Sequence, residues 1–121
     1  LTVYGEGRQT RSFCDVRDTV AALDMLAACP AAWGEVVNVG NDQEISIRDL
    51  AELIVQRTHS TSPLHFISYN DAYGEEFEDV AHRRPVLNKL RALTGFVPEW
   101  SLRDTLDDLI ERERAKNRRA A

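Results

Sequence analysis

The sequence predicts a mixed α/β (α+β) domain, because short β-prone segments and amphipathic helical patterns follow one another along its 121 residues. Hydrophobic residues make up 43% of the chain and charged residues 29%, which is near the average for a globular domain and excludes collagenous or low-complexity classes. There is no internal repeat and no linker of Pro, Gly and Ser residues. We therefore expect residues 1–121 to form a single domain.

Extended segments are expected at residues 1–4, 11–14, 35–39 and 64–68. The first segment reads Leu-Thr-Val-Tyr and precedes a Gly-Glu-Gly turn signal. Residues 35–39 read Glu-Val-Val-Asn-Val, an apolar run that is typical of a buried strand.

Helices are predicted after Asp15, Ser46 and Ser101, whose side chains can accept hydrogen bonds from the first backbone N–H groups. Each of the two serines stands three residues before an acid, which is the form of a capping box. Apolar residues then recur at intervals of three and four. A shorter helix is expected from Val86 onward and ends at Gly95.

The stretch from Tyr69 to Arg84 is polar and acidic and shows no clear periodicity. The sequence predicts a surface loop here, and its length suggests a function.

The net charge of −5, from 15 basic and 20 acidic residues, argues against binding to nucleic acid or to an anionic membrane. Basic residues nevertheless collect at 111–121. We predict a frayed basic helix end there, whose cations suit the negative pole of the helix dipole. A polyanion-binding tail is the alternative.

Cys14 and Cys29 have no C-x-x-C spacing and are predicted to be reduced, which favours a cytoplasmic protein. No apolar stretch is long enough for a transmembrane helix, and no signal peptide is recognisable. The histidines are scattered, so no metal site is predicted.

The sequence contains no glycine-rich phosphate loop and no nucleophile elbow, so no catalytic and no cofactor-binding residue can be named. Arginines occur in two segments that could bind an anion, around Arg11 and at Arg83-Arg84. A guanidinium group suits planar, bidentate contact with phosphate. The alternative is that these arginines pair with surface carboxylates.

Residues 1–13, Leu-Thr-Val-Tyr-Gly-Glu-Gly-Arg-Gln-Thr-Arg-Ser-Phe, resemble the start of the substrate-binding part of NAD-dependent nucleotide-sugar epimerases and dehydratases. This family lies within the extended short-chain dehydrogenases/reductases and includes UDP-glucose 4-epimerases and UDP-glucuronate decarboxylases. Further segments match in order at 37–41, 44–51 and 83–98, and then Ser101-Leu102 leads into the last helix. The resemblance covers essentially the whole chain.

The resemblance implies that the chain is the C-terminal sugar-nucleotide-binding lobe of such an enzyme. The Rossmann portion, with its glycine-rich NAD loop and its Tyr-x-x-x-Lys pair, would be a separate N-terminal part. The intact parent would use NAD and pass through a 4-keto sugar. We expect the fragment, which opens at Leu1 within an expected strand, to bind no cofactor and to be inactive alone.

The resemblance also implies a substrate site for a UDP- or dTDP-linked sugar. Val3 and Tyr4 would lie near the nucleobase, Arg11 and Arg83 would hold the diphosphate, and Gln9 would help to hold the nucleotide.

Three positions depart from the family pattern: Asp15 stands where an aromatic residue is usual, Val86 replaces the Asp of the Arg-x-Pro-Asp segment, and Arg84 is an extra cation. The alternative is therefore a catalytically inactive, stand-alone binding or oligomerisation module. The expected partners are a nucleotide sugar and the Rossmann half, or a second copy in a homo-oligomer, and neither nucleic acid nor a membrane.

Overall fold

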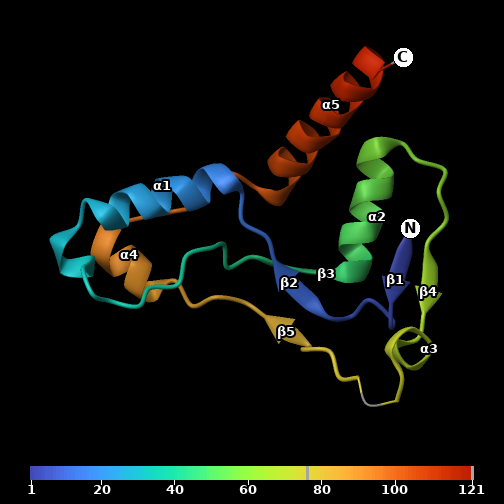
Figure 1. Cartoon of the computed structure of the whole chain (residues 1–121), viewed down its shortest axis with the longest axis horizontal. Coiled ribbons are helices and arrows are strands. Elements are labelled where there is room, and N and C mark those ends of the chain that lie inside the picture. Colours follow the sequence, from blue (N-terminus) through green and yellow to red (C-terminus); the bar gives the residue numbers. More distant parts are fainter. Residues whose placement is uncertain (76, 121) are drawn as a thin grey trace. The chain divides into compact units, whose positions relative to one another are not determined.

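The computed structural model describes residues 1–75 and 77–120, the last two of these by their backbone alone. The prediction of a mixed α/β fold is confirmed, since the described chain contains both strands and helices, interspersed along its length (Figure 1). The elements group into two compact units. Unit 1 joins Leu1–Arg11 to Glu44–Arg83, and unit 2 joins Ser12–Gln43 to Arg84–Ala121. That the whole of 1–121 folds as a single domain stays a prediction.

A parallel strand pair forms one side of unit 1. Both extended stretches predicted at 1–4 and 64–68 contain a strand, and β1 (Thr2–Tyr4) pairs with β4 (His65–Ile67). Helix α2 (Ile47–Thr58) contacts β1. Val3, the central residue of β1, is completely buried and so serves as a core residue of unit 1.

A second, three-stranded sheet continues unit 1. Its strands, in spatial order, are β3 (Glu44–Ser46), β2 (Thr10–Ser12) and β5 (His82–Arg83). Strands β2 and β5 run parallel, with Thr10 opposite His82 and Arg11 opposite Arg83. The register thus makes neighbours of two arginines that lie far apart in the sequence.

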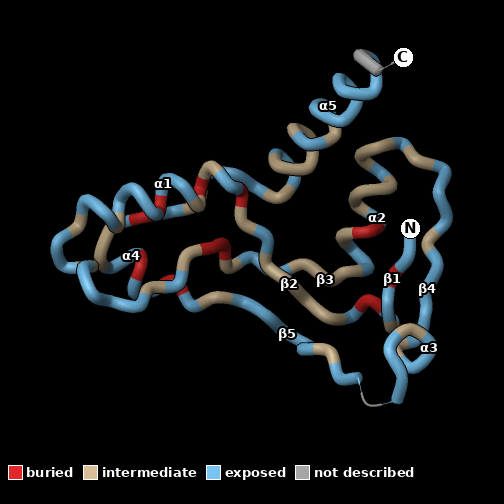
Figure 2. The backbone as a smooth tube through the Cα atoms, viewed as in Figure 1, coloured by how far each residue is buried: buried red, intermediate tan, exposed pale blue. Residues whose placement is uncertain are grey.

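Unit 2 is built mainly from helices around a small apolar core. Its elements are α1 (Val16–Ala27), the 3₁₀ turn η1 (Pro30–Ala32), α4 (Asn88–Thr94) and α5 (Leu102–Ala120). The buried core residues, red in Figure 2, are Ala22, Leu87, Leu90 and Phe96. Leu26 of α1 and the extended residues Val37 and Val39 pack against this cluster.

The predicted helix starts after Asp15, Ser46 and Ser101 are confirmed, whereas the helix expected from Val86 begins at Asn88. The Asp15 carboxylate accepts a hydrogen bond from the backbone N–H of Arg17 at 2.8 Å, at the start of α1. Ser46 and Ser101 each accept one from the N–H three residues later, at 3.0 and 3.2 Å. Gly95 ends α4 with φ 70°, a left-handed conformation that glycine adopts without strain.

The strand predicted at residues 35–39 is wrong. Within the described residues no other segment forms a ladder with it, and a strand needs a hydrogen-bonded neighbour. Val37 and Val39 still turn inward, whereas Val36 is 88% exposed. The Val36 carbonyl instead accepts a hydrogen bond from Lys89 Nζ at 2.9 Å.

The loop predicted over Tyr69–Arg84 is wrong at both of its ends. A short helix, α3 (Tyr69–Tyr73), begins this segment, and β5 (His82–Arg83) closes it. Ser68 caps α3 by accepting a hydrogen bond from the backbone N–H of Asp71 at 3.1 Å. This is the same Ser-x-x-Asp form that predicted α2 and α5.

Helix α5 continues to Ala120, so most of the predicted basic end at 111–121 is helical. Arg112 Nη2 lies 2.9 Å from Asp108 Oδ2, one turn earlier. Ala121 lies outside the described residues, and fraying of this end stays a prediction. None of the helices in the described part of the chain is long and apolar enough to cross a membrane.

Candidate functional site

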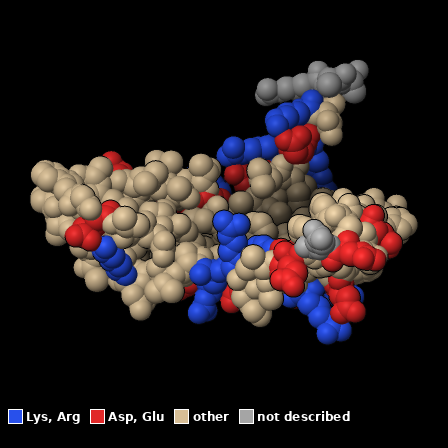
Figure 3. All heavy atoms as spheres, turned by 60° about the horizontal axis from the view of Figure 1, so that its bottom comes forward, with Lys and Arg blue, Asp and Glu red and all other residues tan. Residues whose placement is uncertain are grey.

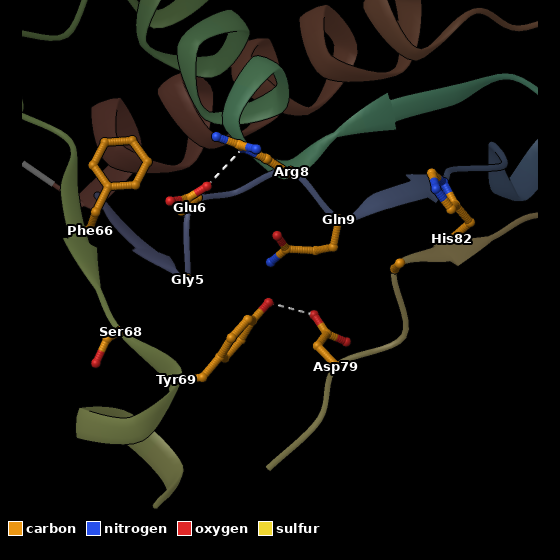
Figure 4. Close-up of a pocket in the computed structure, with 10 residues that line it drawn as sticks. Gly5, Glu6, Arg8, Gln9, Phe66, Ser68, Tyr69, Asp79 and His82 are labelled. Carbon is orange, nitrogen blue, oxygen red and sulfur yellow. Dashed lines mark hydrogen bonds and ion pairs between the residues drawn. The ribbon is translucent and has the colours of Figure 1, made fainter. Parts of the chain in front are cut away.

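Unit 1 contains a cavity of about 720 Å³ (Figure 4). It lies between the turn that follows β1, the segment from β4 into α3, and the residues leading into β5. The lining residues are Gly5, Glu6, Arg8, Gln9, Phe66, Ser68, Tyr69, Asp79, Ala81 and His82. Both aromatic rings and polar groups therefore face the same space.

The two glycines of the first turn shape this cavity. Gly5 and Gly7 have φ values of 64° and 71°. A Cβ on Gly5 would lie 2.6 Å from the ring of Tyr69, and a Cβ on Gly7 would lie 3.0 Å from the backbone nitrogen of Arg48. The Gly-x-Gly sequence thus allows the turn to pass close to α2 and α3 and to carry Gln9 to the cavity.

Asp79 links two elements at the cavity. Arg11 Nη2 lies 2.6 Å from Asp79 Oδ1, and both side chains are 23% exposed. The Tyr69 hydroxyl donates a hydrogen bond to the other carboxylate oxygen at 2.7 Å. Arg11 Nη1 donates to the carbonyls of Thr10 and Val80 at 2.7 and 2.8 Å. Both terminal nitrogens of this guanidinium therefore have partners within unit 1.

Tyr69 is held in its protonated form. Burial, followed by the hydrogen bond to Asp79, raises the pKa of Tyr69 to about 12. A phenol in this state donates a hydrogen bond at any physiological pH. Figure 4 shows the side chains of Tyr69 and Asp79 directed toward one another at the edge of the cavity.

An aromatic cluster adjoins this pair. The rings of Tyr73 and Phe77 are stacked with centroids 4.4 Å apart, and Tyr4 packs on Tyr73 at 5.2 Å. Tyr69 contacts Phe77 at 5.3 Å. Such a cluster offers ring faces and edges for a planar ligand group.

A polar network lies on the β5 side of the cavity. The Thr10 hydroxyl donates to Glu44 Oε1 at 2.5 Å and lies 2.8 Å from His82 Nδ1. His82 itself lines the cavity. The network joins all three strands of the sheet and steadies the imidazole ring at the cavity edge.

The structure brings together some of the residues predicted for the substrate site. Arg11 and Arg83 are register partners on β2 and β5. Gln9 lines the cavity, and its Nε2 donates to the Tyr4 carbonyl at 3.2 Å. The Tyr4 ring lies in the aromatic cluster, whereas Val3 is buried and does not face the cavity. Arg11 also has the carboxylate partner that the alternative interpretation of the arginines predicted.

Tyr69, Asp79 and His82 were missed by sequence reasoning. They lie in the segment predicted as a loop, and that segment's acidic composition did not single out one carboxylate. The Ser68-x-x-Asp71 cap was the available signal for α3, and hence for the position of Tyr69. Nothing in the sequence indicates that Asp79 meets Arg11.

Side-chain caps occupy part of the N–H groups at three helix starts. Asp15, Ser46 and Ser101 each accept a hydrogen bond from one backbone N–H at the start of α1, α2 and α5, which leaves fewer N–H groups for a pyrophosphate there. In the described part of the chain, no three His, Cys, Asp or Glu side chains are placed to hold a metal.

The chain is a mixed α/β portion with a cavity in unit 1, and its relatives show which proteins it resembles. The chain is 36% identical over 111 residues to a UDP-N-acetyl-alpha-D-glucosaminuronate decarboxylase of Bacillus cytotoxicus. This match covers 92% of the chain and 34% of the relative. No family model matches the chain.

Solved structures share the fold. A UDP-glucuronic acid 4-epimerase from Bacillus cereus, in complex with NAD, superposes with a TM-score of 0.74 at 23% identity, covering 93% of the chain and 35% of the epimerase. A UDP-glucose 4-epimerase from Thermotoga maritima, with UDP-glucose, gives a TM-score of 0.79 at 21% identity, covering 96% and 35%.

The chain is therefore a relative of the nucleotide-sugar epimerases, dehydratases and decarboxylases of the extended short-chain dehydrogenase/reductase group, and the predicted resemblance is confirmed. It spans about a third of the length of the relatives that it matches. This extent agrees with the prediction of a partial, C-terminal lobe.

Proposed function

We propose that this chain is the part of an NAD-dependent UDP- or dTDP-sugar epimerase, dehydratase or decarboxylase that binds the nucleotide sugar. The observation that carries the proposal is the register of β2 and β5, which pairs Arg11 with Arg83. Register partners on neighbouring strands point to the same face of a sheet and are about 4.8 Å apart along the hydrogen bonds. Two guanidinium groups that extend from the same face of the sheet can contact the two phosphates of a nucleoside diphosphate.

The cavity beside the arginines supports the nucleoside part of this proposal. Gln9 offers an amide that can donate and accept hydrogen bonds, and Phe66 and Tyr69 offer apolar walls. The Tyr4 ring extends the aromatic surface through its contact with Tyr73. A uracil or thymine ring with its ribose fits this combination of planar, apolar and hydrogen-bonding groups.

Catalysis and NAD binding are assigned to a different part of the parent protein. The 121-residue sequence contains no glycine-rich dinucleotide loop, and the starts of α1, α2 and α5 are capped by side chains. The B. cereus relative is an NAD complex, so NAD is the cofactor that we propose for the parent. This chain then supplies binding and orientation, while the cofactor supplies hydride chemistry. The free thiols of Cys14 and Cys29 support a cytoplasmic protein.

Isothermal titration of the chain with UDP and dTDP tests the proposal. Removing one charge-assisted contact costs about 1.5–3 kcal/mol, so Arg11→Ala and Arg83→Ala should each weaken binding by about tenfold or more. Arg91→Ala is the matched control, because Arg91 pairs with Asp42 in unit 2 at 2.9 Å. Unchanged affinity in both site variants would remove the diphosphate clamp.

A second candidate is a stand-alone oligomerisation module, and one observation favours it. Helix α1 exposes Val16, Val20 and Leu23 at i, i+4 and i+7, and the nearby Trp33 and Val36 are 69% and 88% exposed. Figure 3 shows mainly uncharged side chains over the face of unit 2 that is turned to the viewer, at its left. A helix face of this kind normally packs against another element.

The Rossmann half of the parent is the partner that we propose for this face, and a second copy is the competing partner. Light scattering on the isolated chain separates the two. A concentration-dependent dimer that Val20→Asp dissociates would support the oligomerisation module, whereas a monomer at all concentrations would leave the Rossmann half as the partner.

A further inference from the structure

We propose that Asp79 is a specificity-determining residue of this site: its carboxylate occupies the phosphate position on Arg11, and a diphosphate ligand must displace it. The inference rests on the proposed function, because it concerns the same pair of arginines. It assigns a role at the site to a residue that the sequence did not indicate. It also predicts that a ligand with one phosphate binds much more weakly than a ligand with two.

The contacts of Arg11 are the basis of the proposal. Nη2 lies 2.6 Å from Asp79 Oδ1, and Nη1 donates to the carbonyls of Thr10 and Val80. A phosphate that takes the contact which Nη2 now makes must therefore displace the carboxylate of Asp79. Carboxylate and phosphate oxygens make the same kind of charge-assisted hydrogen bond with a guanidinium, so each can replace the other.

The position of Asp79 in the fold lets such an exchange occur without a change in any helix or strand. Asp79 follows α3 and precedes β5, outside any helix or strand of the described chain. Its other carboxylate oxygen accepts a hydrogen bond from Tyr69, which also lines the cavity. The contacts that the Asp79 carboxylate makes with Arg11 and Tyr69 thus lie at the wall of the cavity that would receive the ligand. Rotating one side chain away requires no disruption of a helix or a sheet.

The exchange selects for a second phosphate. A ligand with one phosphate gains a contact with Arg11 but loses the contact that Asp79 made, so its net gain is small. A diphosphate also reaches Arg83, the register partner of Arg11 on the exposed strand β5. Because the Arg83 contact replaces no carboxylate seen in the described residues, it adds to the affinity in full.

Isothermal titration of the full chain with UDP, inorganic pyrophosphate and uridine tests the inference. Asp79→Asn keeps the shape of the side chain and removes its charge. We expect Asp79→Asn to raise the affinity for UDP and for pyrophosphate by about tenfold, which corresponds to about 1.4 kcal/mol. The affinity for uridine should not change. Tyr69→Phe, which frees one oxygen of Asp79, should act in the same direction with a smaller effect.

Glu78→Gln is the matched control. Glu78 is the exposed neighbour of Asp79, and no contact joins it to Arg11 among the described residues. The substitution therefore removes the same charge without changing the ion pair. If it tightens pyrophosphate as much as Asp79→Asn does, the effect is a general change in charge and the inference is wrong. The inference is also wrong if Asp79→Asn leaves pyrophosphate affinity unchanged or weakens it, because Asp79 would then position Arg11 for the ligand.

The pyrophosphate arm separates this inference from the proposed function. Tighter pyrophosphate binding by Asp79→Asn, with no binding of UDP, would support the exchange at Arg11 and overturn the nucleotide site. UDP binding that depends on Arg11 and Arg83 but not on Asp79 would support the nucleotide site and overturn the exchange.

Discussion

Replacing Asp15 by alanine should destabilise unit 2 more than any other single change at a helix end. Asp15 is buried and caps α1 through the backbone N–H of Arg17 at 2.8 Å. Its carboxylate also accepts hydrogen bonds from Arg17 Nε and Nη2, at 2.8 and 2.7 Å. The Thr105 hydroxyl of α5 donates to the same carboxylate at 2.7 Å. One side chain therefore joins the start of α1 to α5.

The magnitude follows from these contacts. Loss of an N-cap costs about 1 kcal/mol. Loss of a hydrogen bond to a charged group costs about 1.5–3 kcal/mol, and the half-exposed Arg17 recovers part of that from water. Arg17 also stacks over Trp100 at 3.4 Å and lies 3.5 Å from Asp108 Oδ2, so it keeps some partners. We expect Asp15→Ala to lower the free energy of unfolding by about 3 kcal/mol.

Urea unfolding followed by circular dichroism at pH 7 measures the change. Asp24→Ala is the control, because Asp24 is an exposed acid on the same helix whose side chain makes no contact with Arg17 or Thr105. A loss below about 1 kcal/mol for Asp15→Ala would refute the reasoning, since a simple cap would then account for it.

The same carboxylate predicts a pH dependence. The hydrogen bonds from Arg17 and then from Thr105 hold the pKa of Asp15 well below its ordinary value, although burial opposes them. A depressed pKa means that the unfolded chain binds the proton more readily, so the stabilisation is present above about pH 4 and is lost as the pH falls further. The stability difference between wild type and Asp15→Asn should therefore narrow below about pH 4.

Three further outcomes follow from burial, backbone conformation and titration. Leu90→Ala removes a fully buried side chain from the core of unit 2 and should cost about 2–5 kcal/mol in urea unfolding. Gly7→Ala places a Cβ 3.0 Å from the backbone nitrogen of Arg48 at φ 71° and should cost about 1–3 kcal/mol, with weaker UDP binding than a surface glycine variant. A titration followed by ultraviolet absorbance should show Tyr69 ionising near pH 12, and at a lower pH in Asp79→Asn. Because the pKa of Tyr69 is raised in the folded chain, its contribution to the free energy of unfolding is present below about pH 10 and is lost as the pH rises toward 12.

Helix ends were predictable because the signals are local. Ser46 and Ser101 each accept a hydrogen bond from an N–H only three residues away, so the pattern and the contact lie within one turn. The same pattern at Ser68 starts α3. It was overlooked because α3 is too short to show apolar periodicity.

The segment 35–39 shows the opposite case. Its apolar run does place Val37 and Val39 against the core, as a buried strand would. A strand, however, also needs a neighbour to complete its backbone hydrogen bonds, and local sequence cannot provide one. The pattern therefore predicted correctly which side chains turn inward and wrongly that a ladder forms.

At Arg11, the sequence indicated the chemistry of the side chain but not which partner it contacts. Sequence reasoning left two interpretations of this arginine, an ion pair with a carboxylate and a contact with phosphate. The structure contains the ion pair, with Asp79 as the partner, and also brings Arg83 into register with Arg11. These interpretations exclude each other only if the carboxylate is fixed. Asp79 lies at the cavity wall outside any helix or strand of the described chain, so its carboxylate can leave Arg11 when a phosphate arrives. The same guanidinium can then bind the carboxylate in the free protein and the phosphate in the complex. The change in pyrophosphate affinity caused by Asp79→Asn tests this exchange.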